Sequence, residues 1–271
     1  MANEIQTLPQ LLAMKPVQEK FVDILGKSSA SFMASLLTIW NDDEKLKKCE
    51  PVTILSAAKQ AAILQLPIMK QLGYSYVIPY YDGRSKKYVA QFQLGYKGLL
   101  QLAMRSGVFR NLNTTAIYNG QLKKIDYLTG EIEIGEKASD EVIGYAAYME
   151  LLNGFKKTLY ITKAEMELHA QTYSDSYRAD KEKKWSVWAK NFDAMAKKTV
   201  LKKLLNTYAP TSIEMQQSNL NQAMQADQSV ITQNGYQYVD NTGADSQVEV
   251  ETLDAETGEI STEEEIEVPF D

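Results

Sequence analysis

Apolar residues in the first quarter of the chain recur at the spacing of amphipathic helices. This spacing runs from residue 17 to residue 46 and is interrupted from Gly26 to Ser29, which predicts two short helices. A further helix is expected from Pro51 to Gln65, because proline is favoured at the first helical position and Pro67 stops the helix. The fold therefore begins with a group of helices.

From residue 74 the pattern changes to one that is typical of strands. The segments Tyr74 to Tyr81 and Lys87 to Leu94 flank the turn pair Asp82-Gly83 and predict a hairpin. Phe92 shares the apolar face of the second strand and is expected in the core. The polar positions on the opposite face of that strand are Gln91 and Gln93. One face of the hairpin is thus expected to be solvated.

The middle of the chain predicts one short amphipathic helix followed by strands. The helix is expected from Tyr96 to Ser106, where apolar residues recur on one side. Strands are expected at Leu112 to Tyr118, in a hairpin from Leu122 to Ile134, and in a hairpin from Val142 to Ile161. The second of these hairpins should turn at Asn153-Gly154, a favourable turn pair.

Two more helices are expected to complete the core. Thr162 and Glu165 match a capping box, which starts a helix that should reach about Ala170. A polar loop separates this helix from a last one, expected from Trp185 to Tyr208. Together the segments predict an α+β fold, in which a central antiparallel β-sheet with hairpins is packed by helices.

The charges divide the chain into a basic and an acidic part, although the net charge is −6. All 29 Lys and Arg lie in residues 1–210 and are offset there by 21 acidic residues, which gives +8. Residues 211–271 hold 14 acidic residues and no base, which gives −14. This asymmetry predicts a nucleic-acid-binding body and a disordered, acidic C-terminal tail, with one short helix expected at 213–226. A solvated tail without a partner is the alternative.

The segment from Arg84 to Arg110 combines positive charge with aromatic rings and contains no acid. Cations for phosphates and flat rings for bases are the two requirements of single-strand binding. Its charged candidates are Arg84, Lys86, Lys87, Lys97, Arg105 and Arg110. Lys97, Gln101 and Arg105 line one side of the expected helix. Gly95 precedes that helix, so its start offers free backbone amides for a phosphate, although a plain strand-to-helix turn explains the glycine equally well.

A second basic cluster lies on the last core helix. Its members are Lys190, Lys197, Lys198, Lys202 and Lys203. Lys190 and Lys197 fall opposite the first apolar face of the helix and are expected to face phosphate. The two clusters predict basic surfaces that face DNA.

Catalytic patterns are weak. A P-loop would need a glycine where Phe21 stands, so ATP binding of that kind is not expected. His169 with Glu165 and Asp175 could hold a divalent ion, but a helix surface with ordinary charges is the favoured reading. Cys49 is the one cysteine and forms no disulfide within the chain. We therefore expect no catalytic residue, no metal and no cofactor.

Residues Tyr76 to Gly107 read YVIPYYDGRSKKYVAQFQLGYKGLLQLAMRSG and resemble the signature of the RecT family of phage single-strand DNA annealing proteins, or recombinases. The likeness continues through Val142 to Gly154 and Trp188 to Thr199. On this match the central motif positions are taken by Gln93, Gly95, Tyr96, Lys97, Gly98 and Arg105. Lys197 and Lys198 match the family's basic terminal helix.

The resemblance implies ATP-independent binding and annealing of single strands in the homologous recombination of phage DNA. It implies a non-enzymatic core at 1–210, in which the sheet and helices form a basic DNA-binding groove. This core also assembles into rings or helical filaments and binds the annealed duplex. A phage exonuclease is the implied partner. The acidic C-terminal region resembles the tips of bacterial single-strand-binding proteins, which makes the host single-strand-binding protein a second candidate partner.

Three other readings stay open. A passive single-strand DNA coat protein or a replication adaptor would bind DNA but would slow annealing, and a metal-dependent nuclease would cut it. The sequence has no run of about 18 apolar residues that could cross a bilayer, and it does not begin with a signal peptide. The bacterial cytosol is therefore the expected location.

Overall fold

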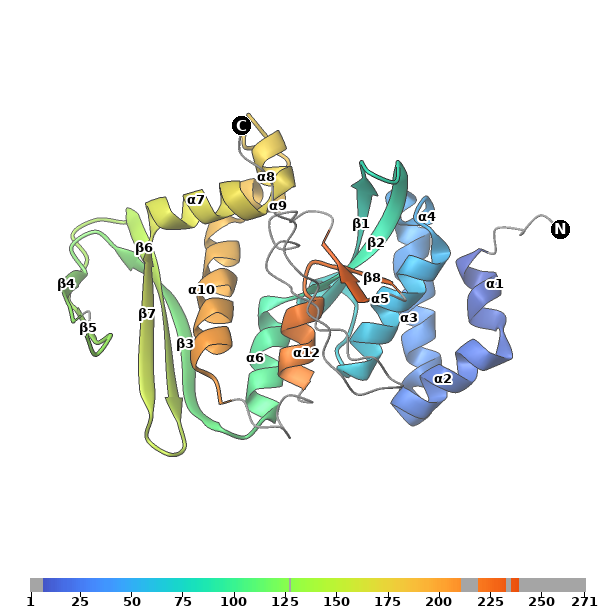
Figure 1. The fold of residues 1–271 in the computed structure, drawn as a ribbon, viewed down its shortest axis with the longest axis horizontal. Coiled ribbons are helices and arrows are strands. Elements are labelled where there is room, and N and C mark those ends of the chain that lie inside the picture. Colours follow the sequence, from blue (N-terminus) through green and yellow to red (C-terminus); the bar gives the residue numbers. More distant parts are fainter. Residues whose placement is uncertain (1–6, 127, 211–218, 233–234, 239–271) are drawn as a thin grey trace, which may run out of the picture.

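The computed structural model describes residues 7–126, 128–210, 219–232 and 235–238, which form helices and antiparallel sheets. The N-terminal part is helical, as predicted, and the expected interruption near Gly26 is a short 3₁₀ turn, η1. The elements of this part are α1 (Leu8–Ala13), α2 (Lys15–Leu25), η1 (Gly26–Ser28), α3 (Ser29–Asp42), α4 (Glu44–Lys47), α5 (Pro51–Ile63) and η2 (Lys70–Leu72). Figure 1 shows them packed together at the N-terminal end of the molecule.

The predicted hairpin and the helix after it are both present. Strands β1 (Ser75–Asp82) and β2 (Lys87–Leu94) pair antiparallel, and α6 (Tyr96–Arg105) follows directly. The side chain of Asp82 accepts hydrogen bonds from the backbone N–H groups of Arg84 and Ser85, which fixes the turn.

A three-stranded sheet forms the other end of the molecule, with strand order β3-β6-β7. Its strands are β3 (Phe109–Tyr118), β6 (Val142–Leu151) and β7 (Lys156–Thr162), and the small hairpin of β4 (Leu122–Ile125) and β5 (Ile132–Ile134) stands apart. The predicted turns are confirmed. The strands are nevertheless divided among separate sheets rather than joined in one central sheet, because β1 and β2 form a two-stranded sheet of their own.

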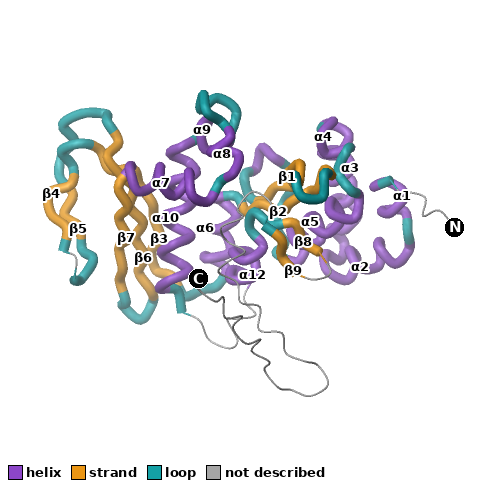
Figure 2. Tube along the Cα trace, turned by 45° about the horizontal axis from the view of Figure 1, so that its top comes forward, coloured by secondary structure: helices purple, strands orange, loops and turns teal. Residues whose placement is uncertain are grey.

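Helices cover one face of this sheet (Figures 1 and 2). They are α7 (Lys163–Tyr173) and α10 (Phe192–Tyr208), while α8 (Asp175–Ala179) packs on α7 and α9 (Val187–Lys190) packs on α10. The capping box of Thr162 and Glu165 starts α7, as predicted. The single helix expected from Trp185 is divided at Asn191 into α9 and α10. Tyr145 of β6 is fully buried against α10, and its hydroxyl donates a 2.5 Å hydrogen bond to Asp193.

Residues 219–232 and 235–238 are part of the folded structure, which corrects the tail boundary expected at residue 211. The last elements are α12 (Asn219–Ala226), β8 (Val230–Thr232) and β9 (Gly235–Gln237). Leu220, Ala223 and Met224 of α12 are buried, so this segment contributes apolar side chains to the core. The short helix expected at 213–226 is present as α12 in its described part, and residues 211–218 and 239–271 lie outside the described residues.

The segment after α12 also closes the free edge of β2. Phe92 donates its backbone N–H to the carbonyl of Ser229 at 2.8 Å and accepts from the N–H of Gln228 at 2.9 Å. Closer to the hairpin turn, Tyr88 and Ala90 bond to Glu50 and Thr53 at the start of α5. An exposed edge strand would leave such groups unpaired. The edge is thus completed by two segments that are far apart in sequence.

Both faces of β2 are covered, which corrects the expectation of a solvated face. Phe92 is buried as predicted, but Gln91 on the opposite face is only 5% exposed, and Val89 beside it is also buried. Gln93 is half-buried. Gln91 is therefore a core residue in this structure rather than part of a DNA-facing surface.

Candidate nucleic-acid interface

Two glycines of the central motif bring α6 against the chain's own backbone. A Cβ atom at Gly95 would lie 2.1 Å from the carbonyl oxygen of Gly73, and one at Gly98 would lie 2.1 Å from that of Tyr74. The N–H of Gly95 donates to the Tyr74 carbonyl at 2.8 Å. Any side chain at either position would collide with backbone. These glycines position α6, and the amide of Gly95 is already used within the protein.

The two cations on the polar side of α6 differ in their contacts. Lys97 is exposed and forms no ion pair with a described residue. Arg105 donates to the carbonyl oxygens of Leu64 (2.9 Å) and Gln65 (3.2 Å), which follow α5. A basic side chain at a helix C-terminus satisfies carbonyls that lack partners in the helix. Arg105 therefore stabilises the end of α5. Gln101, which lies between Lys97 and Arg105 on α6, is half-buried.

Tyr96 connects α6 to the three-stranded sheet. Its hydroxyl lies 2.8 Å from the hydroxyl of Thr114 on β3, and the ring is half-buried. Since an aromatic ring held at both ends is fixed in orientation, Tyr96 positions α6 relative to β3. This contact leaves part of the ring accessible.

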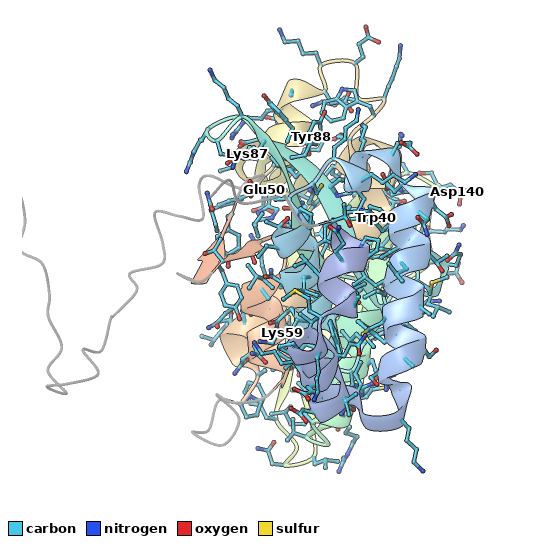
Figure 3. All side chains as sticks on the ribbon, turned by 90° about the vertical axis from the view of Figure 1, so that its right-hand side faces the viewer. Trp40, Glu50, Lys59, Lys87, Tyr88 and Asp140 are labelled. Carbon is cyan, nitrogen blue, oxygen red and sulfur yellow. The ribbon has the colours of Figure 1, made fainter. Side chains whose placement is uncertain are left out.

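Acidic residues from elsewhere in the chain neutralise two cations of the Arg84 to Arg110 segment. Lys87 pairs with Glu50 at 2.5 Å, and Figure 3 shows both at the same end of the molecule. Arg110 pairs with Glu150 of β6 at 3.3 Å. Arg84 and Lys86 are exposed at the turn between β1 and β2. The segment from Arg84 to Arg110 contains no acidic residue, but in the folded chain it lies next to acidic residues of other elements.

Lys198 is buried, which removes it from the predicted DNA-facing set. Lys198 is only 6% exposed, and its Nζ lies 3.0 Å from the carboxylate of Asp227, which is 2% exposed. Lys202 reaches the other carboxylate oxygen at 3.0 Å, and the backbone N–H of Leu94 donates to Asp227 at 2.8 Å. A buried lysine requires such a partner. Lys190 is exposed and Lys197 is half-buried, so both fit the prediction better.

Asp227 is a central residue that the sequence reading assigned to the tail. Burial alone would raise the pKa of Asp227, but the charges of Lys198 and Lys202 outweigh it and hold that pKa below its ordinary value. Leu220, Ala223 and Met224 recur at helical spacing just before Asp227. This spacing indicates that the short helix expected at 213–226 has one buried face, and it is the sequence signal that places Asp227 next to the core.

His169 does not form the ion site considered from the sequence. Glu165 is bound to Thr162 in the capping box, and Asp175 pairs with Arg178. Among the described residues, no three His, Cys, Asp or Glu side chains gather as a metal site would require.

In the described part of the chain, no helix has the length and apolar character needed to cross a membrane.

His169 is expected to stay neutral at pH 7. Burial and the positive charges of Lys203 and Lys202 lower the pKa of His169 to about 4. The unfolded chain binds this proton at higher pH than the folded chain, so the free energy of unfolding should fall as the pH drops from about 6.5 to about 4. NMR of the imidazole Cε1–H should show no titration between pH 5 and 8. A midpoint above pH 6 would contradict this.

Comparison with known proteins agrees with the resemblance of the central motif. The RecT family model matches residues 30–239. "Uncharacterized protein YqaK" of Bacillus subtilis (strain 168) is 40% identical over 276 residues, which cover 98% of this chain and 91% of that protein. "Protein RecT" of Escherichia coli (strain K12) is 27% identical over 178 residues, 64% of this chain and 63% of that protein. The chain therefore belongs to the RecT family, whose members are single-strand DNA annealing proteins of DNA recombination.

Proposed function

We propose that this protein binds single-stranded DNA through the exposed cations of the β1–β2 turn, α6 and the α9–α10 region, and anneals complementary strands without ATP or a metal ion. The observation that carries the proposal is that Lys97, on α6 of the central motif, is exposed and forms no ion pair with a described residue. Lys86 and Lys190 are likewise exposed and form no ion pair with a described residue, and the half-buried Lys197 also forms none. Unpaired cations favour contact with phosphate.

Annealing requires that the pairing edges of the bases stay open. Phosphate contacts hold a strand without covering these edges, so a second strand can test its pairing before the duplex is retained. Rings or helical filaments of the chain would repeat the contacts along the strand. The phage exonuclease that makes the single strand and the host single-strand-binding protein are the partners we propose. The protein itself breaks no covalent bond in this scheme, which serves homologous recombination of phage DNA.

The annealing of two complementary fluorescent oligonucleotides, added in sequence without ATP or magnesium, tests the proposal. The wild type should accelerate annealing, and Lys97→Gln should reduce the acceleration and lower the salt dependence of binding by about 0.7 in log-log slope, because one phosphate contact is lost. Lys97 is preferable to Arg105, since removing Arg105 also exposes the carbonyls after α5.

Lys59→Gln is the matched control. Lys59 is exposed on α5, which carries none of the cations of the proposed surface, so this variant loses the same charge outside that surface. Figure 3 shows Lys59 apart from Lys87. It should anneal like the wild type. Binding without acceleration would indicate a coat protein or replication adaptor instead, and shorter DNA products after addition of magnesium would indicate a nuclease.

A further inference from the structure

A cavity of about 300 Å³ lies between α7, α9, α10 and the turn that follows α12. Figures 1 and 2 show α7 and α9 near one end of α10. The cavity wall combines aromatic rings with lysines, and the residues that matter here are His169, Tyr173, Trp188, Lys198, Lys202 and Lys203. The volume is at the lower end for sites that hold small organic ligands, about 300 to 1,000 Å³. It is sufficient for one small ligand.

The wall of the cavity carries an excess of two positive charges. Lys198, Lys202 and Lys203 contribute three, Asp227 removes one, and His169 is neutral at pH 7. Lys203 is exposed and forms no ion pair with a described residue, so it is available to a ligand entering from solvent. A terminal phosphate carries up to two negative charges at pH 7, whereas a phosphate inside a DNA strand carries one. The charge therefore favours a terminal phosphate.

The aromatic part of the wall is preassembled. The ring centroids of His169 and Tyr173 lie 4.7 Å apart, and Trp188 meets His169 edge to face at 6.2 Å. Flat rings of this kind stack on bases of any sequence. His169 also has a buried Nδ1 with no hydrogen-bond partner in the described part of the chain. A buried polar atom without a partner, in a residue that lines a cavity, is consistent with a ligand that supplies the missing bond.

We propose that this cavity binds a nucleoside monophosphate unit, with its terminal phosphate on Lys203 and Lys202 and its base against Tyr173 and Trp188. Two sources share this chemistry: a free nucleotide and the phosphorylated end of a DNA strand. The second source, a phosphorylated strand end, rests on the proposed function, because it requires that the protein binds single-stranded DNA. The site lies apart from Lys97 and the motif helix, whose residues do not line it.

Calorimetric titration of the full chain with thymidine 5′-monophosphate tests the site directly. The wild type should bind it more tightly than thymidine or inorganic phosphate. Lys203→Gln should weaken binding at least tenfold, and because Lys203 is exposed the fold should be retained. Tyr173→Leu should weaken binding of the nucleotide but not of inorganic phosphate. Lys59→Gln, which removes a charge that does not line the cavity, should bind like the wild type. No binding at millimolar concentration, or equal binding by Lys203→Gln, would overturn the proposal.

A second titration identifies the source. Single strands with and without a terminal phosphate, at the 5′ or the 3′ end, are compared on wild type and Lys203→Gln. A preference for the phosphorylated strand that Lys203→Gln loses assigns the site to strand ends. Equal affinity for the strands, with monophosphate binding retained, assigns it to free nucleotides. A chain that anneals but does not bind the monophosphate refutes the site alone. A chain that binds it but does not anneal refutes only the proposed function.

Discussion

Replacing Asp227 with alanine should lower the free energy of unfolding by about 3 to 5 kcal/mol, the usual cost of removing one partner of a buried ion pair. Asp227→Ala leaves Lys198 buried without a counter-charge and removes the acceptor of the Leu94 N–H. Denaturant unfolding followed by circular dichroism at pH 7 measures the effect. Loss of less than about 1 kcal/mol would contradict a charged, buried pair.

Two further variants separate the charge from the hydrogen bond. Asp227→Asn keeps an acceptor for the Leu94 N–H but not the charge, so it should remain destabilised. Adding Lys198→Met to Asp227→Asn should recover part of the loss, because an apolar side chain of similar size is tolerated where an unpaired lysine is not. Glu182→Ala is the control, since Glu182 pairs with Lys184 on the exposed surface and such pairs contribute little.

The same pair predicts a dependence on pH. The pKa of Asp227 lies below its ordinary value of 3.8, so the stability that its carboxylate contributes is fully present above that value. It is lost as the pH falls through the lower pKa of the folded state. The difference between wild type and Asp227→Asn should therefore be largest at neutral pH and should shrink in acid. A difference that grows as the pH falls would contradict the assignment.

Ending the chain at residue 210 should prevent stable folding, whereas ending it at residue 238 should leave the melting temperature close to that of the full chain. The shorter chain lacks Asp227, Ser229 at the edge of β2, and the buried side chains of α12. Each large buried apolar side chain contributes about 1.5 to 3 kcal/mol, so Leu220 and Met224, together with the buried ion pair of Asp227, are comparable to a typical margin of stability. Thermal unfolding of both chains checks this. Equal melting temperatures would contradict the place of α12 in the core.

The chain that ends at residue 238 also tests whether the acidic tail competes with DNA. Residues 239–271 hold 12 acidic residues and no base, so their removal changes the net charge from −6 to +6. DNA binding should become tighter at low salt, and the gain should disappear at high salt, where such charges are screened. Unchanged affinity at low salt would reject competition by the tail.

Local signals explain which parts of the fold were predictable. The turn pairs Asp82-Gly83 and Asn153-Gly154 and the capping box at Thr162 each act within a few residues, and each appears where the sequence places it. The division of the last helix at Asn191 was not found, because Trp185 to Tyr208 contains no proline or glycine to indicate it. Short-range chemistry therefore predicted most elements but not all their ends.

The candidate site was harder to predict, because its decisive contacts join distant residues. Lys87 and Arg110 look unpaired in sequence, yet Glu50 and Glu150 neutralise them from other elements. Arg105 matches the motif as a cation, but its contacts are carbonyls some 40 residues away. Sequence identified Lys97 correctly as an exposed cation, since its helix face is set locally. Its contact with DNA stays a prediction, as does the basic groove.

The bond between Leu94 and Asp227 spans 133 positions, and this has a consequence for how the chain is made. During synthesis the β1–β2 hairpin leaves the ribosome long before the residues that complete its edge. Contacts so distant in sequence slow folding, and an unpaired strand edge promotes aggregation. The hairpin should therefore need protection by a chaperone, or by its own helices, until translation has passed Ser229.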